Sequence, residues 1–493
     1  MSQGKTSQQR TAFDVLAKRL ADRHPGHPLP TPSAGTIVVV PSLTFPVVEL
    51  RKIVGIQHYE ERLLFLLLLL ADPGRRLLYV SSAPIDPAVI DYYLGFLPDP
   101  EGARARLELV ALGDVTPSAL AAKLVDRPEV LDRLAGLLAD PEDALLLTFN
   151  VTRHEREVAE RLGVSLFGPA PELIPLGSKT GSRRVGRAAG VDVLDGSEDL
   201  WSMDEVERAV ERLRRVRPGI DAVVVKLNNG FSGQGNAIVE LGPSDSQDGS
   251  GGRSAWRTTF CAAEESWPSF AAKIGAEGGV VERLVRTAGI ASPSAQVSIA
   301  PGGDIRVVST HDQILGGPSQ QVYLGCRFPA RAEYRPRIQQ DAEAVARVLV
   351  DRGVVGNFGI DFFALDDGRR TRVSLCEINL RMGGTTHPYW MVRLATGAKW
   401  DPAAGQLAVD GRRLFYTATD NLKSARLVGS DPGKVIEAIA SRGLALEPGG
   451  DAGVALHLLG ALHDHGKMGM TCVAGSVEEA DELDREARAL LGV

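Results

Sequence analysis

The stretch LCEINLRMGGTTHP, residues 375–388, holds the pattern on which the interpretation of this chain depends. Three polar residues alternate there with Cys376, Ile378 and Leu380, which is the period-two pattern of a β-strand with one apolar face. The polar face carries an acid, an amide and a guanidinium in order: Glu377, Asn379 and Arg381. A bland amphipathic edge strand would also alternate. The rest of the chain has to decide between such an ordinary strand and one whose polar face has a function.

A hairpin is predicted to bring an aspartate beside this strand. The segments NFGIDFFAL and TRVSLCEINLR predict two strands around DDGR, where an Asp-Gly pair favours a hairpin turn. A turn centred near Gly368 places Asp361 opposite residues 374–375, with Glu377 a near-diagonal neighbour at roughly 7 Å or less. Two carboxylates and an amide oxygen are hard donors suited to Mg²⁺. The pattern therefore predicts Asp361, Glu377 and Asn379 as metal ligands, with a solvated acidic sheet face as the alternative.

The composition is that of a large globular protein without an overall excess of positive charge. The chain has 493 residues and 52.7 kDa, 44% hydrophobic and 24% charged, which is enough for two to four domains. A net charge of −7 speaks against a nucleic-acid partner. The run LLFLLLLLA at residues 63–71 is too short to span a membrane, so it predicts a buried helix and no membrane partner. Four cysteines without zinc-site or disulfide spacing favour a reducing cytoplasm: Cys261, Cys326, Cys376 and Cys472.

The order of apolar runs predicts an α/β part followed by an α+β part. Residues 1–35 are expected to be a flexible segment with a short helix and a Pro/Gly-rich linker. Between residues 36 and 170, strands alternate with helices, which predicts a parallel sheet covered on both faces. Strands and hairpins dominate residues 171–400, and residues 401–493 have the size of a small α+β subdomain. The low-complexity segment at residues 244–254 predicts a surface insertion.

Two lysines are candidates for binding phosphate. The chain has 11 Lys against 44 Arg, and between Lys123 and Lys273 the only lysines are Lys179 and Lys226. A compact ammonium can meet a phosphate oxygen as a point charge, which a broad guanidinium cannot. Lys226 ends the apolar run AVVVK, and NNGFSGQGN follows, whose glycines let backbone amides approach an anion. An ordinary hairpin turn is the alternative. The chain has no Walker motif, and no GxGxxG follows its first strand.

These motifs together resemble the ATP-grasp superfamily of carboxylate–amine ligases. The order Lys179, Lys226 with its glycine-rich loop, VVERLV, GIDFF and EINLR extends over about residues 170–400. The flanking motifs VPSLTF, HYEERLLF and LGSKTGSR are similar to the peptide ligases related to the one in pheganomycin biosynthesis. The resemblance implies a pre-ATP-grasp domain over residues 36–170, a two-lobed ATP-grasp domain over 171–400 and a C-terminal subdomain over 401–493.

The resemblance also implies ATP and Mg²⁺ as cofactors, and a role for each matching residue. Lys179 and Lys226 would contact the α- and β-phosphates. Glu282 with Leu284 would form the hinge that holds adenine, and Arg381 would face the transferring phosphoryl group or the acyl-phosphate. The loop over the triphosphate would consist of Asn229, Gly230, Phe231, Ser232, Gly233, Gln234 and Gly235. The magnesium ligands would be Asp361, Glu377 and Asn379.

Other candidates compete with plain structural roles. Many relatives place a second acid beyond the hinge to contact the ribose. This chain instead reads RTAGIASPSAQ there, and Gln296 is the candidate for that contact. Arg306 could meet the acyl substrate or phosphate, and His387 could touch substrate or take a proton. A solvent-facing sheet arginine and a structural histidine before proline are the alternatives. The segment HDHGK at residues 463–467 predicts a surface turn rather than a metal cluster.

The sequence thus predicts an ATP-dependent ligase that joins a carboxylate to an amine through an acyl-phosphate, releasing ADP and phosphate. In the resembled family the donor is an unusual amino acid and the acceptor a peptide N-terminus, which implies a place in antibiotic biosynthesis. A homodimer is left open. Two other functions remain as alternatives: a phosphotransferase acting on a small molecule, and a nucleotide-binding regulatory module without turnover.

Overall fold

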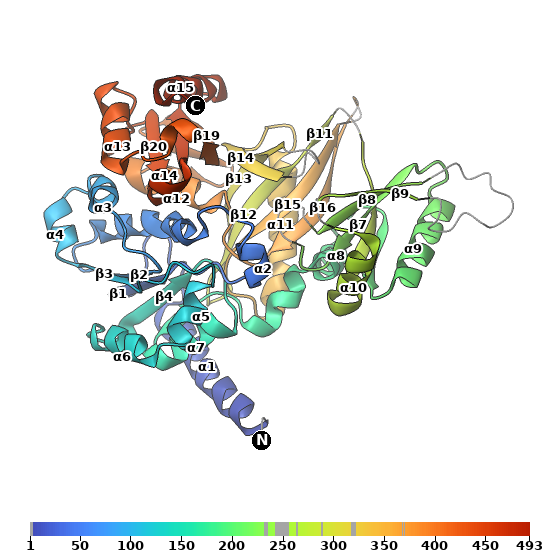
Figure 1. Ribbon diagram of the computed structural model, residues 1–493, viewed down its shortest axis with the longest axis horizontal. Helices are drawn as coiled ribbons and strands as arrows, with labels where there is room; N and C mark the ends of the chain where they lie inside the picture. Colours follow the sequence, from blue (N-terminus) through green and yellow to red (C-terminus); the bar gives the residue numbers. More distant parts are fainter. Residues whose placement is uncertain are drawn as a thin grey trace.

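The computed structural model describes residues 3–230, 235–241, 256–262, 265–286, 289–316, 322–366, 368 and 370–493. Two predicted features, the loop residues 231–234 and the insertion at residues 244–254, lie outside the described residues. In Figure 1 the N-terminal part (blue and cyan) and a smaller green lobe lie at opposite ends of the view, with a long sheet in yellow and orange between them. The C-terminal part (red) lies next to the N-terminal part.

A parallel sheet forms the centre of the N-terminal part, as predicted. Its strands are β1 (Thr36–Val40), β2 (Arg76–Ser81), β3 (Leu107–Ala111), β4 (Ala144–Thr148) and β5 (Ser165–Phe167). They pair in parallel in the order β3-β2-β1-β4-β5. The central strands are runs of Val and Leu because helices cover both faces. The strand order reverses between β1 and β4, and ligand sites of such sheets lie at the carboxyl ends of the strands there.

Short helices connect these strands, and side chains cap several of them. The side chain of Asp86 caps the first of the longer ones, and Thr152 with Glu155 forms a capping box on the last. The helical segments of this part are α2 (Val47–Leu50), α3 (Pro87–Leu94), α4 (Pro100–Arg104), α5 (Leu120–Val125), α6 (Pro128–Gly136), η2 (Pro141–Asp143) and α7 (Arg153–Leu162).

The N-terminal segment differs from the loose, flexible one that was predicted. Helix α1 (Gln3–Arg23) begins near the start of the chain and buries Leu16 and Leu20. The linker after it packs on the long sheet, because His27 Nδ1 lies 2.8 Å from Ser298 Oγ. Helix propensity alone underestimated the length and the order of this segment, because the residues that it packs against lie far away in the sequence.

The leucine run is a buried helix, as predicted. It belongs to the 3₁₀ segment η1 (Ile56–Ala71), and every residue from Leu63 to Leu70 is buried. Two charged residues at its start, Glu60 and Glu61, are buried as well. The Glu60 carboxylate accepts hydrogen bonds from the Ser82 amide and hydroxyl at 2.6 and 2.7 Å, which satisfies it inside the fold.

The green lobe in Figure 1 is a small antiparallel sheet with helices against it. Its strands are β6 (Gly196–Leu200), β7 (Ala222–Leu227), β8 (Asn236–Glu240), β9 (Arg257–Phe260) and β10 (Gly279–Arg283). They pair in the order β6-β10-β7-β8-β9. Helices α9 (Met203–Val216) and α10 (Trp267–Glu277) pack on this sheet, whereas η3 (Pro171–Gly177) and α8 (Lys179–Ala188) pack mainly on the long sheet.

The long sheet carries the strand with which the sequence argument began. Its first strands are β11 (Ile290–Ala291), β12 (Pro293–Ile299), β13 (Ile305–Gly316), β14 (Val322–Phe328), β15 (Gly356–Asp366) and β16 (Thr371–Asn379). Helix α11 (Arg335–Asp351) packs on this sheet, and α12 (Thr386–Thr396) follows β16. Strands β15 and β16 form the predicted hairpin.

The C-terminal residues extend the same long sheet. Strand β19 pairs with β14, and β21, which follows later in the chain, pairs with β19. A boundary near residue 400 therefore falls within one continuous sheet. The strands are β17 (Lys399–Asp401), β18 (Gln406–Val409), β19 (Arg412–Lys423), β20 (Gly453–His457) and β21 (Lys467–Ala474). The helical segments are η5 (Ala425–Leu427), α13 (Pro432–Ser441), η6 (Leu459–Ala461), α14 (Leu462–His465) and α15 (Val477–Leu491).

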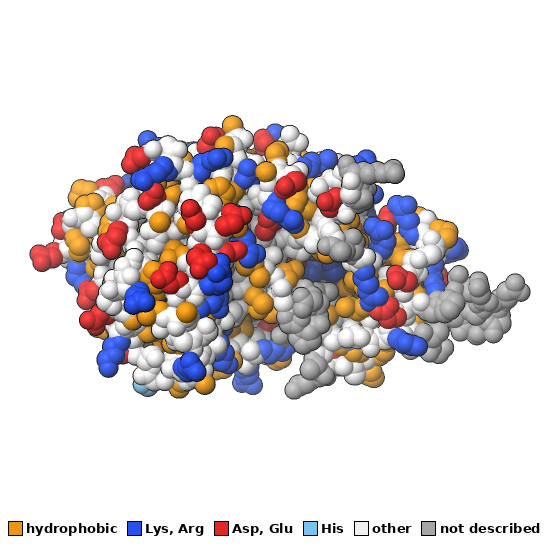
Figure 2. All heavy atoms as spheres, turned by 90° about the horizontal axis from the view of Figure 1, so that it is seen from above, with side chains coloured by type: hydrophobic (Ala, Val, Ile, Leu, Met, Phe, Trp, Pro, Cys, Tyr) orange, Lys and Arg blue, Asp and Glu red, His pale blue; other side chains and the backbone are white. Residues whose placement is uncertain are grey.

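The visible surface carries charges of both signs. Figure 2 shows acidic and basic side chains interspersed over the face that it presents. Within the described ranges, no helix is long and apolar enough to cross a membrane.

Candidate active site

A single large cleft collects residues from all parts of the chain. Its volume is about 1730 Å³. Leu43, Phe45 and Phe149, which follow β1 and β4, line it from the parallel sheet. The small lobe contributes Lys226 from β7, and the long sheet contributes the acidic hairpin. The cleft is large enough for a nucleotide and further small molecules.

The hairpin aligns its carboxylates more directly than predicted. Asp361 on β15 is the cross-strand partner of Glu377 on β16. The sequence pattern had predicted that Asp361 lies opposite residues 374–375 instead. The turn is wider than assumed, and the register shifts between Asp361 and Phe362, which leaves Cys376 as the extra residue of a β-bulge. The bulge also corrects the predicted apolar face, because Cys376 lines the cleft.

Hydrogen bonds hold this acidic group in place. Asn379 Nδ2 donates to Asp361 Oδ2 at 2.9 Å, and Gln313 Nε2 donates to Asp361 Oδ1 at 2.8 Å. Arg381 Nη2 donates to Asn379 Oδ1 at 3.0 Å. Burial, and after it the Glu377 carboxylate, raises the pKa of Asp361 to about 7. Two crowded carboxylates and an amide oxygen suit a hard divalent cation, which would offset the repulsion between them.

No three His, Cys, Asp or Glu side chains of the described residues form a metal-binding group. The predicted set contains only two carboxylates beside its asparagine, so phosphate oxygens and water would have to complete the shell of Mg²⁺, as is usual for this ion. His463 and Asp464 pair with each other on the surface, where the side chain of His463 is 74% exposed. The segment HDHGK as a whole is not the surface turn that was predicted, because residues 462–465 form a short helix and Lys467 is buried at the start of β21.

Lys179 lies at the first position of α8 and points at the acidic hairpin. Its ammonium forms an ion pair with Glu377. The start of the helix is fastened to the end of β7, because Asn228 Oδ1 accepts from the Thr180 amide at 2.9 Å and the Asn228 carbonyl accepts from the Lys179 amide at 3.1 Å. Asn228 was not predicted, although it stands in the NNG run directly after Leu227.

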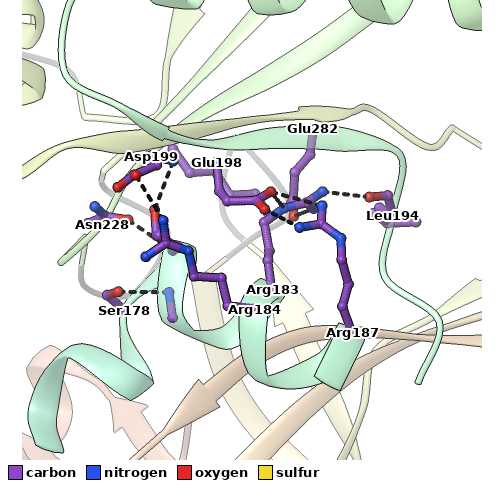
Figure 3. A network of polar contacts seen from close by, with 12 residues as sticks. Ser178, Arg183, Arg184, Arg187, Leu194, Glu198, Asp199, Asn228 and Glu282 are labelled. Carbon is purple, nitrogen blue, oxygen red and sulfur yellow. Dashed lines mark hydrogen bonds and ion pairs between the residues drawn. The ribbon is translucent and has the colours of Figure 1, made fainter. Parts of the chain in front are cut away.

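Lys226 belongs to a buried ionic network that Figure 3 shows around Glu282 and Arg183. The Lys226 ammonium lies 2.6 Å from Glu282 Oε2, and Arg183 Nη1 lies 2.5 Å from Glu282 Oε1. Arg183 also donates to Glu198 Oε2 and to the Leu194 carbonyl, each at 3.0 Å. Burial alone would lower the pKa of Lys226, but the Glu282 carboxylate raises it above its ordinary value. Lys226 is therefore a permanent cation in the cleft.

The network limits which groups of Glu282 could contact a nucleotide. Its carboxylate is paired with two cations, and its backbone pairs with β6 and β7. Adenine would therefore contact the backbone of the residues that follow Glu282. Leu284 lines the cleft, but its amide donates to the Ala222 carbonyl at 3.2 Å. Gln296 also lines the cleft, yet it pairs with Gly359 across β12 and β15, beside Asn379, and accepts from Thr386 Oγ1 at 3.0 Å.

Two glycines close the neck of the loop that was predicted to cover the triphosphate. Asn229 and Gly230 follow β7 and Gly235 precedes β8, while residues 231–234 lie outside the described part. A Cβ on Gly235 would lie 2.6 Å from the Gly230 Cα, and a Cβ on Gly230 would lie 2.9 Å from the Gly235 Cα. Only glycine at both positions allows the two backbones to approach this closely.

We expect Gly235→Ala to lower ATP-dependent turnover by roughly 10- to 100-fold, because the added Cβ would force the Gly230 and Gly235 backbones apart. Steady-state ADP release measures this. The matched control is Gly136→Ala at the end of α6, where a Cβ meets nothing within 4 Å. It should leave turnover unchanged and add about 0.5–1 kcal/mol of stability. Wild-type ADP release by Gly235→Ala would mean that the neck has no role.

Arg306 is not brought to the cleft. It lies near the start of β13, with its side chain 55% exposed and its Nε 3.5 Å from Asp304 Oδ2. The strand is 12 residues long, so Arg306 and Gln313 are separated by roughly 23 Å at about 3.3 Å per residue. The residue of this strand that reaches the acidic hairpin is Gln313, which was overlooked because an amide gives a weaker signal than a guanidinium.

His387 is also outside the cleft, in the first turn of α12. It is 4% exposed and packs edge-to-face on His457 with ring centroids 4.6 Å apart. Burial lowers the pKa of His387 well below its ordinary value, so the ring is neutral. The structural alternative for this histidine fits its position, and the catalytic role does not.

Two family models match the chain, one described as "IQCH-like, ATP-grasp" over residues 257–402 and one as "PGM1 C-terminal domain" over residues 434–487. An L-propargylglycine–L-glutamate ligase from Streptantibioticus cattleyicolor is 30% identical over 474 residues, which cover 94% of this chain and 95% of that one.

Solved structures share the fold at lower identity. Biotin carboxylase from Campylobacter jejuni has a TM-score of 0.54 at 13% identity, covering 92% of this chain and 91% of its own. The ADP complex of N5-carboxyaminoimidazole ribonucleotide synthetase, purK, has a TM-score of 0.51 at 14% identity, covering 92% and 95%. Similarity over nearly the whole length of the ligase relative, with this fold, means that the chain belongs to the ATP-grasp ligases, the ATP- and Mg²⁺-dependent enzymes that join a carboxylate to an amine.

Proposed function

We propose that this ligase activates the carboxylate of one amino acid with ATP and joins it to the amine of a second amino acid or a peptide. A carboxylate oxygen attacks the γ-phosphorus, and the bond from phosphorus to the β–γ bridging oxygen breaks, which releases ADP and leaves an acyl-phosphate. The amine nitrogen then attacks the acyl carbon, the bond to the phosphate oxygen breaks, and the nitrogen loses one proton. The products are an amide, ADP and phosphate.

The observation that carries this proposal is the convergence of opposite charges in one cleft. Lys179 comes from the start of α8, Lys226 comes from β7 of the small lobe, and Asp361 and Glu377 come from the long sheet. Lys226 is also close enough to Glu377 for that carboxylate to help raise its pKa against the effect of burial, after Glu282 and Cys376. Two ammonium groups facing two carboxylates suit a polyphosphate with its metal, because each group neutralises a different part of the ligand.

Asp361, Glu377 and Asn379 are the residues that would hold Mg²⁺. When bound, the ion would offset the negative charge of the triphosphate. Asn379 contributes its amide oxygen, which Arg381 orients at 3.0 Å. Gln313 holds Asp361 from the neighbouring strand. We therefore assign Gln313 and Arg381 the role of orienting the ligands.

Arg381 is the cation that we assign to the acyl-phosphate. Its guanidinium also donates to the Met382 carbonyl at 3.0 Å, and its Cζ lies 5.6 Å from the Phe45 ring and 5.9 Å from the Phe149 ring. These two rings exclude water from one side of the group. Charge stabilisation is stronger in such an environment than in water, and a dry site also protects the acyl-phosphate from hydrolysis.

The relative's name supports amino acids as the substrate class, since that enzyme joins L-propargylglycine and L-glutamate. We propose an unusual amino acid as the donor and an amino acid or peptide as the acceptor, in the biosynthesis of an antibiotic or a similar product. The four cysteines all lie in the described part of the chain and form no disulfide bond there, which favours the cytoplasm as the compartment.

The test is a screen of paired L-amino acids and dipeptides with MgATP, followed by ADP release and mass spectrometry. We expect ADP release that needs both a donor and an acceptor, with a product of the summed mass less one water. Hydroxylamine in place of the acceptor should give the donor hydroxamate. A phosphorylated small molecule without a hydroxamate would identify a phosphotransferase instead. Binding of ATP without any turnover would favour the regulatory module.

A further inference from the structure

A second charged group lies in the cleft, apart from the residues assigned to ATP. It consists of Tyr59, Arg62, Asp420 and Lys467, which we call the rear cluster. Tyr59 and Arg62 belong to η1, Asp420 lies near the end of β19, and Lys467 begins β21. The N-terminal and C-terminal parts of the chain therefore meet here.

The contacts within the rear cluster are close. Arg62 forms an ion pair with Asp420, and the Lys467 ammonium donates to the Tyr59 hydroxyl at 2.5 Å. The Tyr59 ring is shared by both cations, because its centroid lies 4.2 Å from Arg62 Cζ and 4.7 Å from Lys467 Nζ. Lys467 is 6% exposed and Asp420 is 2% exposed. The group is thus ordered and largely dehydrated.

The rear cluster carries a net positive charge. It contains two cations and one carboxylate, and the exposed Lys423 on the same wall of the cleft adds a third cation. Asp420 pairs with Arg62, and among the described residues no carboxylate lies within 4 Å of the Lys467 ammonium. The pKa of Lys467 is lowered, mainly by burial, and the Asp420 carboxylate, which acts to raise it, is already paired with Arg62. A buried ammonium without a carboxylate of its own is costly, so a site that keeps one suits an anionic ligand.

The rear cluster is close to the reacting centre. The pKa of Arg381 is lowered, mainly by burial, and the charge of Arg62 acts in the same direction. Tyr323, which lines the cleft, packs on the loop that follows Arg381, because a Cβ on Gly384 would lie 2.6 Å from its ring. A molecule held by Lys467 can therefore extend toward the group that Arg381 faces.

We infer that the rear cluster binds the free carboxylate of the amine acceptor, with Lys467 as its main contact and Arg62 and Tyr59 as positioning residues. This inference rests on the proposed function. The choice of the acceptor follows from charge. A donor amino acid with a single carboxylate spends it on the reaction and keeps a cationic amine, which the rear cluster would repel. An amino acid or peptide acceptor uses its amine and keeps an anionic carboxylate. The acceptor class is therefore one with an unblocked carboxylate.

The alternative is an ion cluster that only fastens β19 and β21 to η1. A kinetic comparison separates the two roles. The probes are the best donor and acceptor pair from the amino-acid screen, the carboxamide of that acceptor, and hydroxylamine. We expect wild-type enzyme to prefer the free acid over the carboxamide by about tenfold or more in kcat/KM, because a charged hydrogen bond is lost.

Lys467→Met keeps the length and apolar volume of the side chain. We expect it to raise KM for the free acid by about tenfold or more and to reduce the preference over the carboxamide to within about twofold. Hydroxamate formation and KM for ATP should stay within about twofold, since neither needs an acceptor carboxylate. The matched control is Lys434→Met at the start of α13, an exposed lysine, which should behave as wild type.

Two results would overturn the inference while the proposed function stands. One is an unchanged preference for the free acid in Lys467→Met. The other is an equal loss of hydroxamate formation, which would assign the rear cluster to the donor or to the fold. Should Lys467→Met not fold, Tyr59→Phe decides in its place, because it removes the hydroxyl that orients the ammonium and keeps the ring. Its preference for the acid should fall too, and an unchanged one would count against the rear cluster. Without any donor and acceptor pair that supports turnover, the proposed function itself fails.

Discussion

We expect Glu377→Gln to lower ligation by at least about 100-fold while ATP binding changes by less than about tenfold. Glu377 is the cross-strand partner of Asp361 and the ion-pair partner of Lys179, so its charge is central to the acidic hairpin. The lysines can still hold the nucleotide when this carboxylate becomes an amide. The metal that offsets charge on the γ-phosphoryl group cannot be placed equally well, so turnover is lost and binding is kept.

The measurements are ADP release with donor and acceptor present, and a nucleotide-binding titration. The matched control is Glu343→Gln on α11, a half-exposed carboxylate that pairs with Arg347 four residues away. It should keep wild-type turnover, because surface ion pairs contribute little. A melting temperature of Glu377→Gln within a few degrees of wild type excludes misfolding. Near-normal ADP release by the variant would show that the strand is ordinary amphipathic structure.

The second large effect is expected for Lys226→Met, which should raise the Kd for ATP by roughly 10- to 100-fold. The ammonium is 7% exposed and lies 2.6 Å from Glu282 Oε2, within the cleft. Methionine keeps the apolar part of the side chain and removes the charge that would meet phosphate. Glu282 retains Arg183 as a partner, so the loss of stability should be smaller than the about 3–5 kcal/mol of a fully broken buried pair.

Lys273→Met is the matched control for this variant. Lys273 lies on α10, its side chain is 46% exposed, and it pairs with Glu265. The titration should give a Kd for ATP within about twofold of wild type. Titrations should be run well below the melting temperature of both variants, which thermal unfolding measures. Equal Kd values for the two variants would remove Lys226 from the nucleotide site.

Local patterns predicted much of the fold. The Val and Leu runs predicted the parallel sheet, and the Asp-Gly junction predicted the hairpin of β15 and β16. The buried leucine helix was also predicted correctly. The length and packing of α1 were not, because its order depends on contacts such as that of the Arg19 guanidinium with the Gly163 carbonyl, 144 residues away. Such contacts leave no periodic signal in the sequence.

In the candidate site, too, local patterns predicted some features, while others depend on contacts between distant residues. Alternation alone predicted that Glu377, Asn379 and Arg381 share one face, since successive side chains of a strand point to opposite sides. It could not predict the bulge at Cys376, because register depends on both strands and on the width of their turn. For Arg306 and His387 the residue type suggested chemistry that their positions do not allow. Gln313 and Asn228 hold the site with amides, which occur too widely to stand out.

The sequence by itself determined the order of the elements and the polar face of the strand with which the argument began, since both follow from the geometry of neighbouring residues. Only the tertiary structure decided what meets in the cleft. Arg62 and Asp420 are 358 residues apart, and Tyr59 and Lys467 are 408 apart. Their pairing arises because β19 and β21 extend the long sheet to η1, and no short-range pattern encodes a contact made by the packing of whole elements.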